Sequence, residues 1–166
     1  MRSRLRSFVQ LAIFVAVSFV VRASFADHYR VPSGSMEPTV NVGDHVLVNK
    51  AAYGLRIPAT TTYVVRVAEP ARGVVVVLEG VEDPPIVLLK RVVAVGGDVV
   101  EVKDGYVFID GTLSDSRAHG GPEFGPERVP SGHVLVLGDN RSNSRDGRTF
   151  GFVRIERVLG RVVGVL

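Results

Sequence analysis

The sequence predicts a mostly β protein with one folded domain. Hydrophobic residues make up 46% of the 166 residues, valine is over-represented, and 18 glycines and 9 prolines divide the apolar stretches into short runs. β-Branched residues favour strands, and glycine and proline mark the turns between them. A chain of this length can build one hydrophobic core but is too short for a second full domain.

The strands are predicted from short apolar runs and the turns that end them. Residues 43–50 alternate apolar and polar side chains, residues 60–67 are rich in threonine and valine, and residues 73–78 and 86–95 are continuous apolar runs. Asp104-Gly105 lies between two further runs and predicts a hairpin. In chain order, the expected strands are 43–50, 60–67, 73–78, 86–95, 99–102, 106–109, 134–137 and 158–165. Residues 111–128 show little periodicity and predict a surface loop.

Charge and cysteine content exclude several classes of function. The net charge is +3, and Arg2, Arg4 and Arg6 account for it, so the rest of the chain is close to neutral. We therefore expect no binding of nucleic acid. The chain has no cysteine, which excludes thiol nucleophiles, disulfides and cysteine-based zinc sites. We predict no cofactor and no metal site.

An apolar segment near the N-terminus predicts an association with a membrane. Residues 8–21 read FVQLAIFVAVSFVV and carry no charge. This run is shorter than the roughly 20 residues that span a bilayer, so a signal peptide cleaved after Ser24-Phe25-Ala26 is one interpretation. We favour a retained anchor, because Arg6 and Arg22 can extend to the two membrane surfaces from the ends of the span.

The arginines before the span predict its orientation. Positive charge is enriched on the cytoplasmic side of membrane spans, so the N-terminus is expected inside. Residues 1–26 then form a cytoplasmic stub and a transmembrane helix, and residues 27–166 form a domain outside the cytoplasmic membrane. The lipid bilayer is thus an expected partner.

Ser35 is the candidate nucleophile. It lies in the segment PSGSMEPT, where a small glycine-containing turn can expose one hydroxyl. A serine hydroxyl is a poor nucleophile at neutral pH unless a neighbouring base accepts its proton.

Lys90 is the candidate base. It lies in the middle of the run IVLLKRVVAV, and period-two alternation places Leu88, Val92 and Ala94 on its face while Arg91 points the other way. Burial disfavours the ammonium and lowers a lysine pKa from about 10.4 toward 7, where the amine can accept a proton. Alternatively, Lys90 faces solvent on an edge strand or pairs with an acid, and periodicity does not decide between these arrangements.

Histidine is the competing base, because Ser-His-Asp arrangements also activate serine. The positions of the four histidines favour surface roles at a membrane boundary, on a solvated strand face, in a loop and in a turn. They are His28, His45, His119 and His133.

A polar segment, GDNRSNSRDGR, follows the apolar residues 134–137. Such a segment is often only a solvated loop. Here Asp146 and Arg148 could pair and stiffen it, and Ser144 could hold an uncharged lysine amine in place.

Four segments together resemble type I signal peptidases. In chain order they are PSGSMEPT, GDHVLVNKAAYGLRIP, KRVVAVGGDVVEV and GDNRSNSRDGRTFGFV. The resemblance implies coiled antiparallel β-sheets of the signal-peptidase/LexA-like type, with Ser35 as nucleophile and Lys90 as general base. It implies that Ser144 orients the lysine and that Ser33 and the Ser35 backbone N–H form the oxyanion hole. It also implies site-supporting roles for Gly138, Asp146 and Arg148.

The resemblance further implies the substrate. Exported pre-proteins would be cut after small-x-small sites, and the expected pocket residues are apolar: Val31, Met36, Val40, Leu88 and Leu89. Gly147 and Thr149 depart from the family pattern, where a serine and an aromatic are common. Residues 129–132 repeat the VPSG of residues 31–34, and we interpret the repeat as a β-turn without catalytic function.

Three other functions share some of these features. A conjugation-type or otherwise dedicated processing peptidase would have the same four segments. A LexA-like autoprotease would use the same Ser-Lys chemistry on its own chain, and the membrane segment argues against it. A silent membrane-anchored module would bind extended peptides without cutting them. The sequence does not determine the oligomeric state.

Overall fold

The structure is a computed structural model that describes residues 7–8, 10–11, 13–14, 26–56, 63–82, 84–117 and 119–166. The strand pairs in this part of the chain are antiparallel, which confirms the mostly β prediction. The predicted anchor falls largely outside the described residues. Within them, no helix combines the length and the apolar character needed to cross a membrane.

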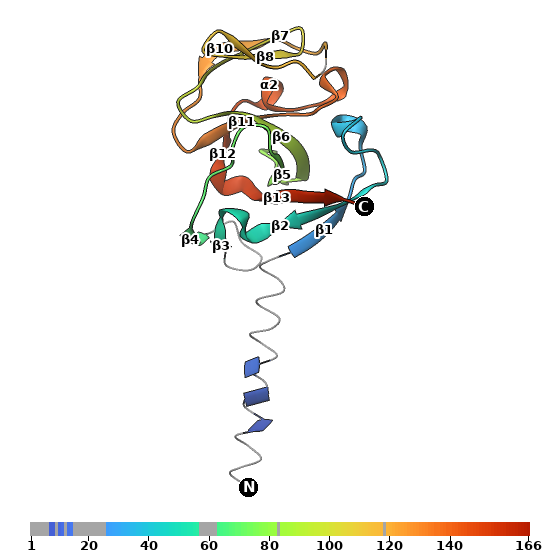
Figure 1. Ribbon diagram of the computed structural model, residues 1–166, viewed down its shortest axis with the longest axis vertical. Helices are drawn as coiled ribbons and strands as arrows, with labels where there is room; N and C mark the ends of the chain where they lie inside the picture. The colour runs from blue at the N-terminus through green and yellow to red at the C-terminus, as the bar shows by residue number, and fades with distance from the viewer. Residues whose placement is uncertain are drawn as a thin grey trace.

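The largest sheet has seven strands. Its order is β1 (Ala26–Arg30), β2 (His45–Asn49), β13 (Val158–Val165), β5 (Val75–Glu79), β6 (Val87–Val95), β11 (His133–Leu137) and β12 (Val153–Arg154). Figure 1 shows β1, β2 and β13 at the bottom of the body and β5, β6 and β11 above them. The sheet therefore joins strands from the beginning, the middle and the end of residues 26–166 in one unit.

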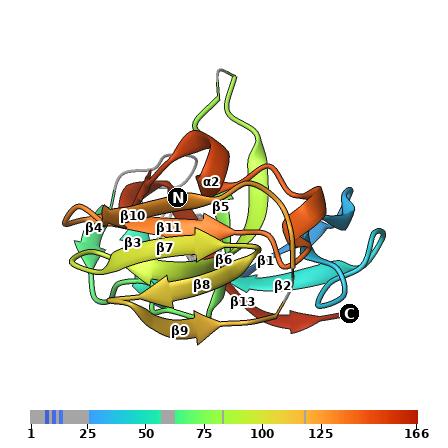
Figure 2. The ribbon, with the colours of Figure 1, turned by 90° about the horizontal axis from the view of Figure 1, so that it is seen from above.

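A second sheet has four strands and lies over the other end of the first, as Figures 1 and 2 show. Its order is β10 (Phe124–Arg128), β7 (Val99–Lys103), β8 (Tyr106–Ile109) and β9 (Thr112–Asp115). A separate pair joins β3 (Gly54–Arg56) and β4 (Tyr63–Arg66). The helical turns are η1 (Gly34–Met36), η2 (Lys50–Tyr53), η3 (Arg141–Asn143), α2 (Gly147–Phe150) and η4 (Ile155–Arg157).

Two predictions about these elements need correction. Residues 111–128 are not a loop, since they contain β9 and β10. Nearly all side chains of both strands are exposed, so no apolar alternation marks them, and the β10–β7 pairing is irregular between Phe124 and Glu127. Three more strands were not predicted: β1, whose sequence ADHYR lacks an apolar run, and β3 and β12, which have only three and two residues.

Strand β6 is buried on both faces. Val76 of β5 lies opposite Lys90, and the pairing with β11 shifts between Leu135 and Val136. The shift is a β-bulge that adds one residue to β6 and interrupts the alternation of its side chains. Period-two alternation therefore holds for Leu88 and Val92, which pack in one core cluster, but Ala94 joins Val93 in another.

A third core cluster lies beneath the turn that carries Ser35. It contains side chains from β2, β5 and the turn itself: Val31, Met36, Val40, Val46, Val48 and Val77. Met36 is fully buried, directly after Ser35. Burial of this side chain, worth about 2 kcal/mol, fixes the turn to the sheet.

Candidate active site

Ser35 and Lys90 meet at the surface of one cavity. The Lys90 Nζ lies 2.8 Å from the Ser35 Oγ and donates a hydrogen bond to it. Lys90 is 3% exposed, so the alternative in which it faces solvent is wrong. The two side chains are in the geometry of a nucleophile and its base.

The environment of Lys90 lowers the pKa of its amine. Burial lowers the pKa of Lys90 from 10.5 to about 8, although the carboxylates of Asp146 and Asp139 act in the opposite direction. A lysine with such a pKa is partly uncharged near neutral pH and can then accept a proton.

The other proposed site residues lie near this pair. Ser33 is the N-cap of η1, and its Oγ lies 3.5 Å from the Ser35 Oγ. The Ser144 Oγ is buried and has no hydrogen-bond partner in the described part of the chain, so the expected contact with Lys90 is not formed. A Cβ on Gly138 would collide with the Ser144 side chain and would lie 2.5 Å from the Ser35 carbonyl oxygen. Glycine at position 138 therefore allows the Ser35 and Ser144 segments to approach closely.

The predicted pair of Asp146 and Arg148 is present and completely buried. Arg148 donates from Nε and Nη2 to the two carboxylate oxygens of Asp146, at 2.9 and 3.0 Å. Asp146 also accepts the Gly138 N–H at 2.9 Å. The pair thereby fixes the backbone at the end of β11, where the polar segment begins.

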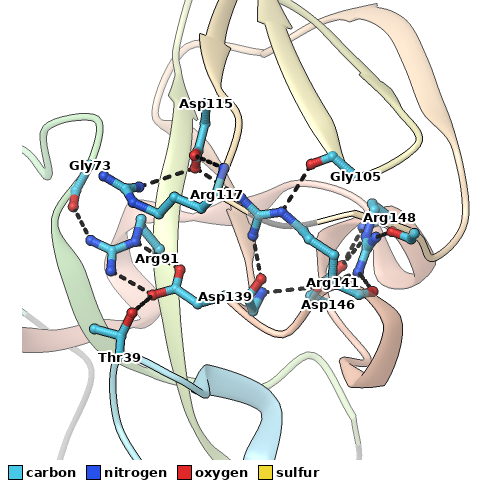
Figure 3. Close-up of polar contacts among 12 residues, drawn as sticks. Thr39, Gly73, Arg91, Gly105, Asp115, Arg117, Asp139, Arg141, Asp146 and Arg148 are labelled. Carbon is cyan, nitrogen blue, oxygen red and sulfur yellow. Dashed lines mark hydrogen bonds and ion pairs between the residues drawn. The ribbon is translucent and has the colours of Figure 1, made fainter.

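A second buried ion pair was not predicted. Arg91 donates to both carboxylate oxygens of Asp139, at 2.8 and 2.6 Å, and Thr39 donates to the same carboxylate at 2.5 Å (Figure 3). Burial alone would raise the pKa of Asp139, but the hydrogen bonds from Arg91 and Thr39 outweigh it and keep that pKa below its ordinary value. This cluster connects β6 with the segment that follows Ser35 and with the polar segment after β11. An arginine inside an apolar strand was the sequence signal for it.

Arg141 joins the polar segment to the four-stranded sheet. Its guanidinium donates to the Gly105 carbonyl at 3.2 Å and to the Asp115 carboxylate at 2.9 Å, and it also donates to the Gly138 carbonyl (Figure 3). Through Arg141, the four-stranded sheet therefore holds the polar segment that carries Ser144 and Asp146.

The cavity beside Ser35 and Lys90 has a volume of about 210 Å³. Four of the five predicted pocket residues, Val31, Met36, Leu88 and Leu89, line it. Val40 is not among the lining residues, although it packs in the same core cluster under the turn as Val31 and Met36. The lining residues that the sequence did not indicate are Tyr29, Arg30, Pro32, Val46, Val77 and Val87.

None of the four histidines lines this cavity. His28 and His45 stack at 6.0 Å on adjacent strands, and His119 contacts the Tyr106 hydroxyl at 3.2 Å. The His133 ring contacts the Ser131 carbonyl. No group of three potential metal ligands gathers anywhere in the described ranges.

The family described as signal peptidase, peptidase S26, matches residues 4–166. The chain belongs to this family. Its sequence is 33% identical to signal peptidase I of Pseudomonas fluorescens over 192 residues, covering 90% of this chain and 67% of the relative. It is 37% identical to the chloroplastic thylakoidal processing peptidase 1 of Arabidopsis thaliana over 155 residues, covering 90% and 44%.

Other similar proteins carry the same name as the first. Signal peptidase I of Pseudomonas aeruginosa is 32% identical, with 88% of this chain and 63% of the relative covered. The chain thus spans about two thirds of the length of the Pseudomonas relatives. A solved signal peptidase I from Enterococcus faecalis V583 aligns with a TM-score of 0.49 and 25% identity, over 58% of this chain and 99% of that one. Family membership confirms the resemblance and classifies the chain as a serine endopeptidase.

Proposed function

We propose that this protein is a membrane-anchored endopeptidase that removes signal peptides from exported pre-proteins by Ser-Lys chemistry. The contact of 2.8 Å between Ser35 Oγ and a buried lysine amine, beside an open cavity, is the observation that carries the proposal. Cleavage after small-x-small sites is the specificity that the family resemblance implies.

The reaction begins when Ser35 Oγ attacks the scissile carbonyl carbon. Its proton passes to the Lys90 amine, and the carbonyl π electrons move to the oxygen to give an oxyanion. When the C–N bond breaks, the Lys90 ammonium returns the proton to the leaving amine and an acyl-enzyme remains. Lys90 then takes a proton from water, whose oxygen attacks the ester, and the released serine recovers its proton.

The oxyanion would be bound by the Ser33 hydroxyl and the Ser35 backbone N–H. Ser33 supports this role because its side chain is exposed on the same turn, next to the Ser35 hydroxyl. Ser144 would orient the Lys90 amine. Its buried, unpartnered hydroxyl is a donor and acceptor that the described residues leave unused. Gly138, Asp146 and Arg148 would keep this arrangement rigid.

The proposed anchor would place the active site at the outer surface of the cytoplasmic membrane. Residues 1–26 would hold the chain in the cytoplasmic membrane in a single pass, with residues 27–166 on the outer face. Only about nine residues separate Ala26 from Ser35, so the nucleophile would stay near the membrane surface. A signal peptide in the same membrane would present its cleavage site there, which raises the effective concentration of the enzyme for its substrate.

A dedicated processing peptidase would use the same residues. The relatives include proteins named signal peptidase I and proteins named thylakoidal processing peptidase, so family membership does not distinguish a broad substrate set from a narrow one.

The test compares the wild type with Ser35→Ala and Lys90→Ala. Each purified chain is incubated with a pre-protein that carries an Ala-x-Ala site, and the new N-terminus is sequenced. We expect cleavage after the second alanine by the wild type alone. Cleavage by both variants would disprove the Ser-Lys assignment. An inert wild type would favour a dedicated substrate or a silent peptide-binding module.

A further inference from the structure

Asn140 contacts both peptide units that flank the Ser35 α-carbon. Its backbone N–H donates to the Ser35 carbonyl at 3.0 Å, and its side-chain Nδ2 donates to the Gly34 carbonyl at 3.1 Å. We propose that Asn140 is a positioning residue that orients the Ser35 N–H toward the oxyanion. The inference rests on the proposed function and adds a residue that acts through the nucleophile turn.

The geometry of the peptide bond explains how an amide on Gly34 controls Ser35. The Gly34 carbonyl and the Ser35 N–H belong to the same planar unit, and in a trans unit they point in opposite directions. The cis bonds of the described chain are at Glu37-Pro38 and Gly125-Pro126, so this unit is trans. Holding the carbonyl oxygen therefore fixes the direction of the N–H.

The turn needs such a constraint because position 34 is a glycine. Glycine has no Cβ and reaches many backbone conformations, so its peptide units rotate more easily than those of other residues. Within η1 the Gly34 carbonyl also accepts the Glu37 N–H, at 3.2 Å. That bond comes from the same short turn, whereas Asn140 ties the peptide to a separate segment 106 residues away.

The orientation of the Asn140 amide is itself determined by a neighbour. The Ser142 hydroxyl donates to the Asn140 Oδ1 at 3.3 Å, which leaves the NH₂ group facing Gly34. On the other side, Asp139 is held by Arg91 and Thr39. The backbone that carries Asn140 is thus fixed relative to β6, the strand of Lys90.

The experiment measures kcat and KM of the full chain with a pre-protein, for the wild type, Asn140→Ala and Asn140→Asp. Asn140→Asp has the same shape but places a carboxylate oxygen against the Gly34 carbonyl. We expect kcat to fall about 10- to 100-fold in both variants with KM changed less than about threefold, because the oxyanion forms only during the reaction. Asn41→Ala is the matched control. Its side-chain amide is exposed and makes no hydrogen bond that the described residues show, while its backbone N–H donates to Asp44 and is kept in the variant, so kcat should equal that of the wild type.

Two further readouts separate positioning from a structural role. A peptide boronic acid ending in Ala-x-Ala forms a tetrahedral adduct with serine, and its affinity should fall by the same factor as kcat. The pH midpoint of the rate should not move in Asn140→Ala, because this variant adds no charge and leaves Lys90 untouched.

An unchanged kcat in both variants would overturn the inference, as would a shifted pH midpoint in Asn140→Ala or a kcat loss without loss of boronate affinity. A wild type that neither cuts the pre-protein nor binds the boronic acid would overturn the proposed function, and the inference with it.

Discussion

Residues 31–34 and residues 129–132 have the same sequence, VPSG, but form different structures. Their valines, Val31 and Val129, are both buried, at 4% and 1% exposure. The first turn, residues 31–34, leads into η1, and the Gly34 carbonyl is held by Asn140. The second turn, residues 129–132, leads into β11 through Gly132, which has a φ of 72°.

The partners of the two turns account for their difference in chemistry. The first turn presents Ser35 to the Lys90 amine, one residue after the shared sequence. The second makes backbone bonds instead: the Pro130 carbonyl accepts the His133 N–H at 3.1 Å, and the Gly132 carbonyl accepts the Ile155 N–H at 2.9 Å. Its interpretation as a turn is confirmed. The same four residues are thus part of a candidate site only in the first turn, where Lys90 and Asn140 from distant segments form hydrogen bonds with it.

Removing the buried partner of Arg148 should have the largest effect on stability. In Asp146→Ala, the guanidinium stays buried without a counter-charge, and the free energy of unfolding should fall by about 3–5 kcal/mol. Urea unfolding followed by circular dichroism measures this. The control Glu101→Ala breaks the more exposed pair with Lys103 and should cost much less. Equal losses would contradict the role given to the buried pair.

Lys90→Met should stabilise the fold. Lowering the Lys90 pKa from 10.5 to about 8 corresponds to a destabilisation of about 3 kcal/mol. Between these pH values the unfolded chain binds the proton and the folded chain does not, so the penalty is complete below pH 8 and disappears as the pH rises toward 10.5. The advantage of Lys90→Met in unfolding experiments should therefore be present at pH 7 and absent near pH 10.5. A variant less stable than the wild type at pH 7 would contradict this account.

The cleavage rate should depend on the neutral form of Lys90. Below pH 8 the amine is mostly protonated, so kcat/KM should rise about tenfold per pH unit and level off above a midpoint of about 8. Initial rates in buffers from pH 6 to pH 10 measure this profile. A midpoint near 6.5 would instead indicate a histidine base.

Thr39→Val should have a smaller effect, since it removes one hydroxyl from the Asp139 carboxylate while Arg91 remains. We expect a loss of about 1 kcal/mol in the free energy of unfolding. Thr149→Val, at an exposed position, is the matched control and should change stability by less than about 0.5 kcal/mol. A loss as large in the control would show that the effect is not specific to Asp139.

The smallest effects are expected in the second turn. Ser131→Ala and His133→Ala should leave the cleavage rate unchanged and alter stability by less than about 0.5 kcal/mol. Lost activity in Ser131→Ala would mean that the wrong serine has been assigned, and the cleavage assay with the pre-protein decides this.

The sequence was sufficient to predict the strands that have a strong apolar pattern. It was also sufficient to predict that Ser35 and Lys90 form a pair. Lys90 could be selected because a single amine in a run of valine and leucine is unusual, but the pattern did not show that the strand is buried on both faces. β9 and β10 were missed because backbone pairing, and not an apolar face, holds them in place.

Contacts between distant segments could not be predicted in the same way. Thr39, Asp139 and Asn140 have side chains that are common in turns, and their importance follows only from partners about 50 or more residues away. Val40 was expected among the apolar side chains around the pocket, but it is not among the residues that line the cavity. The turn directs its side chain into the core instead.

Neighbouring residues of β6 carry an amine and a guanidinium, and only their alignment with β5 decides which of them reaches Ser35. If the strand slipped by one residue, every side chain would change faces and Arg91 would replace Lys90. An arginine stays protonated at all pH values at which the protein is folded, so it could not accept the serine proton. The hydrogen bonds that place Lys90 opposite Val76 therefore select a proton acceptor over a permanent cation.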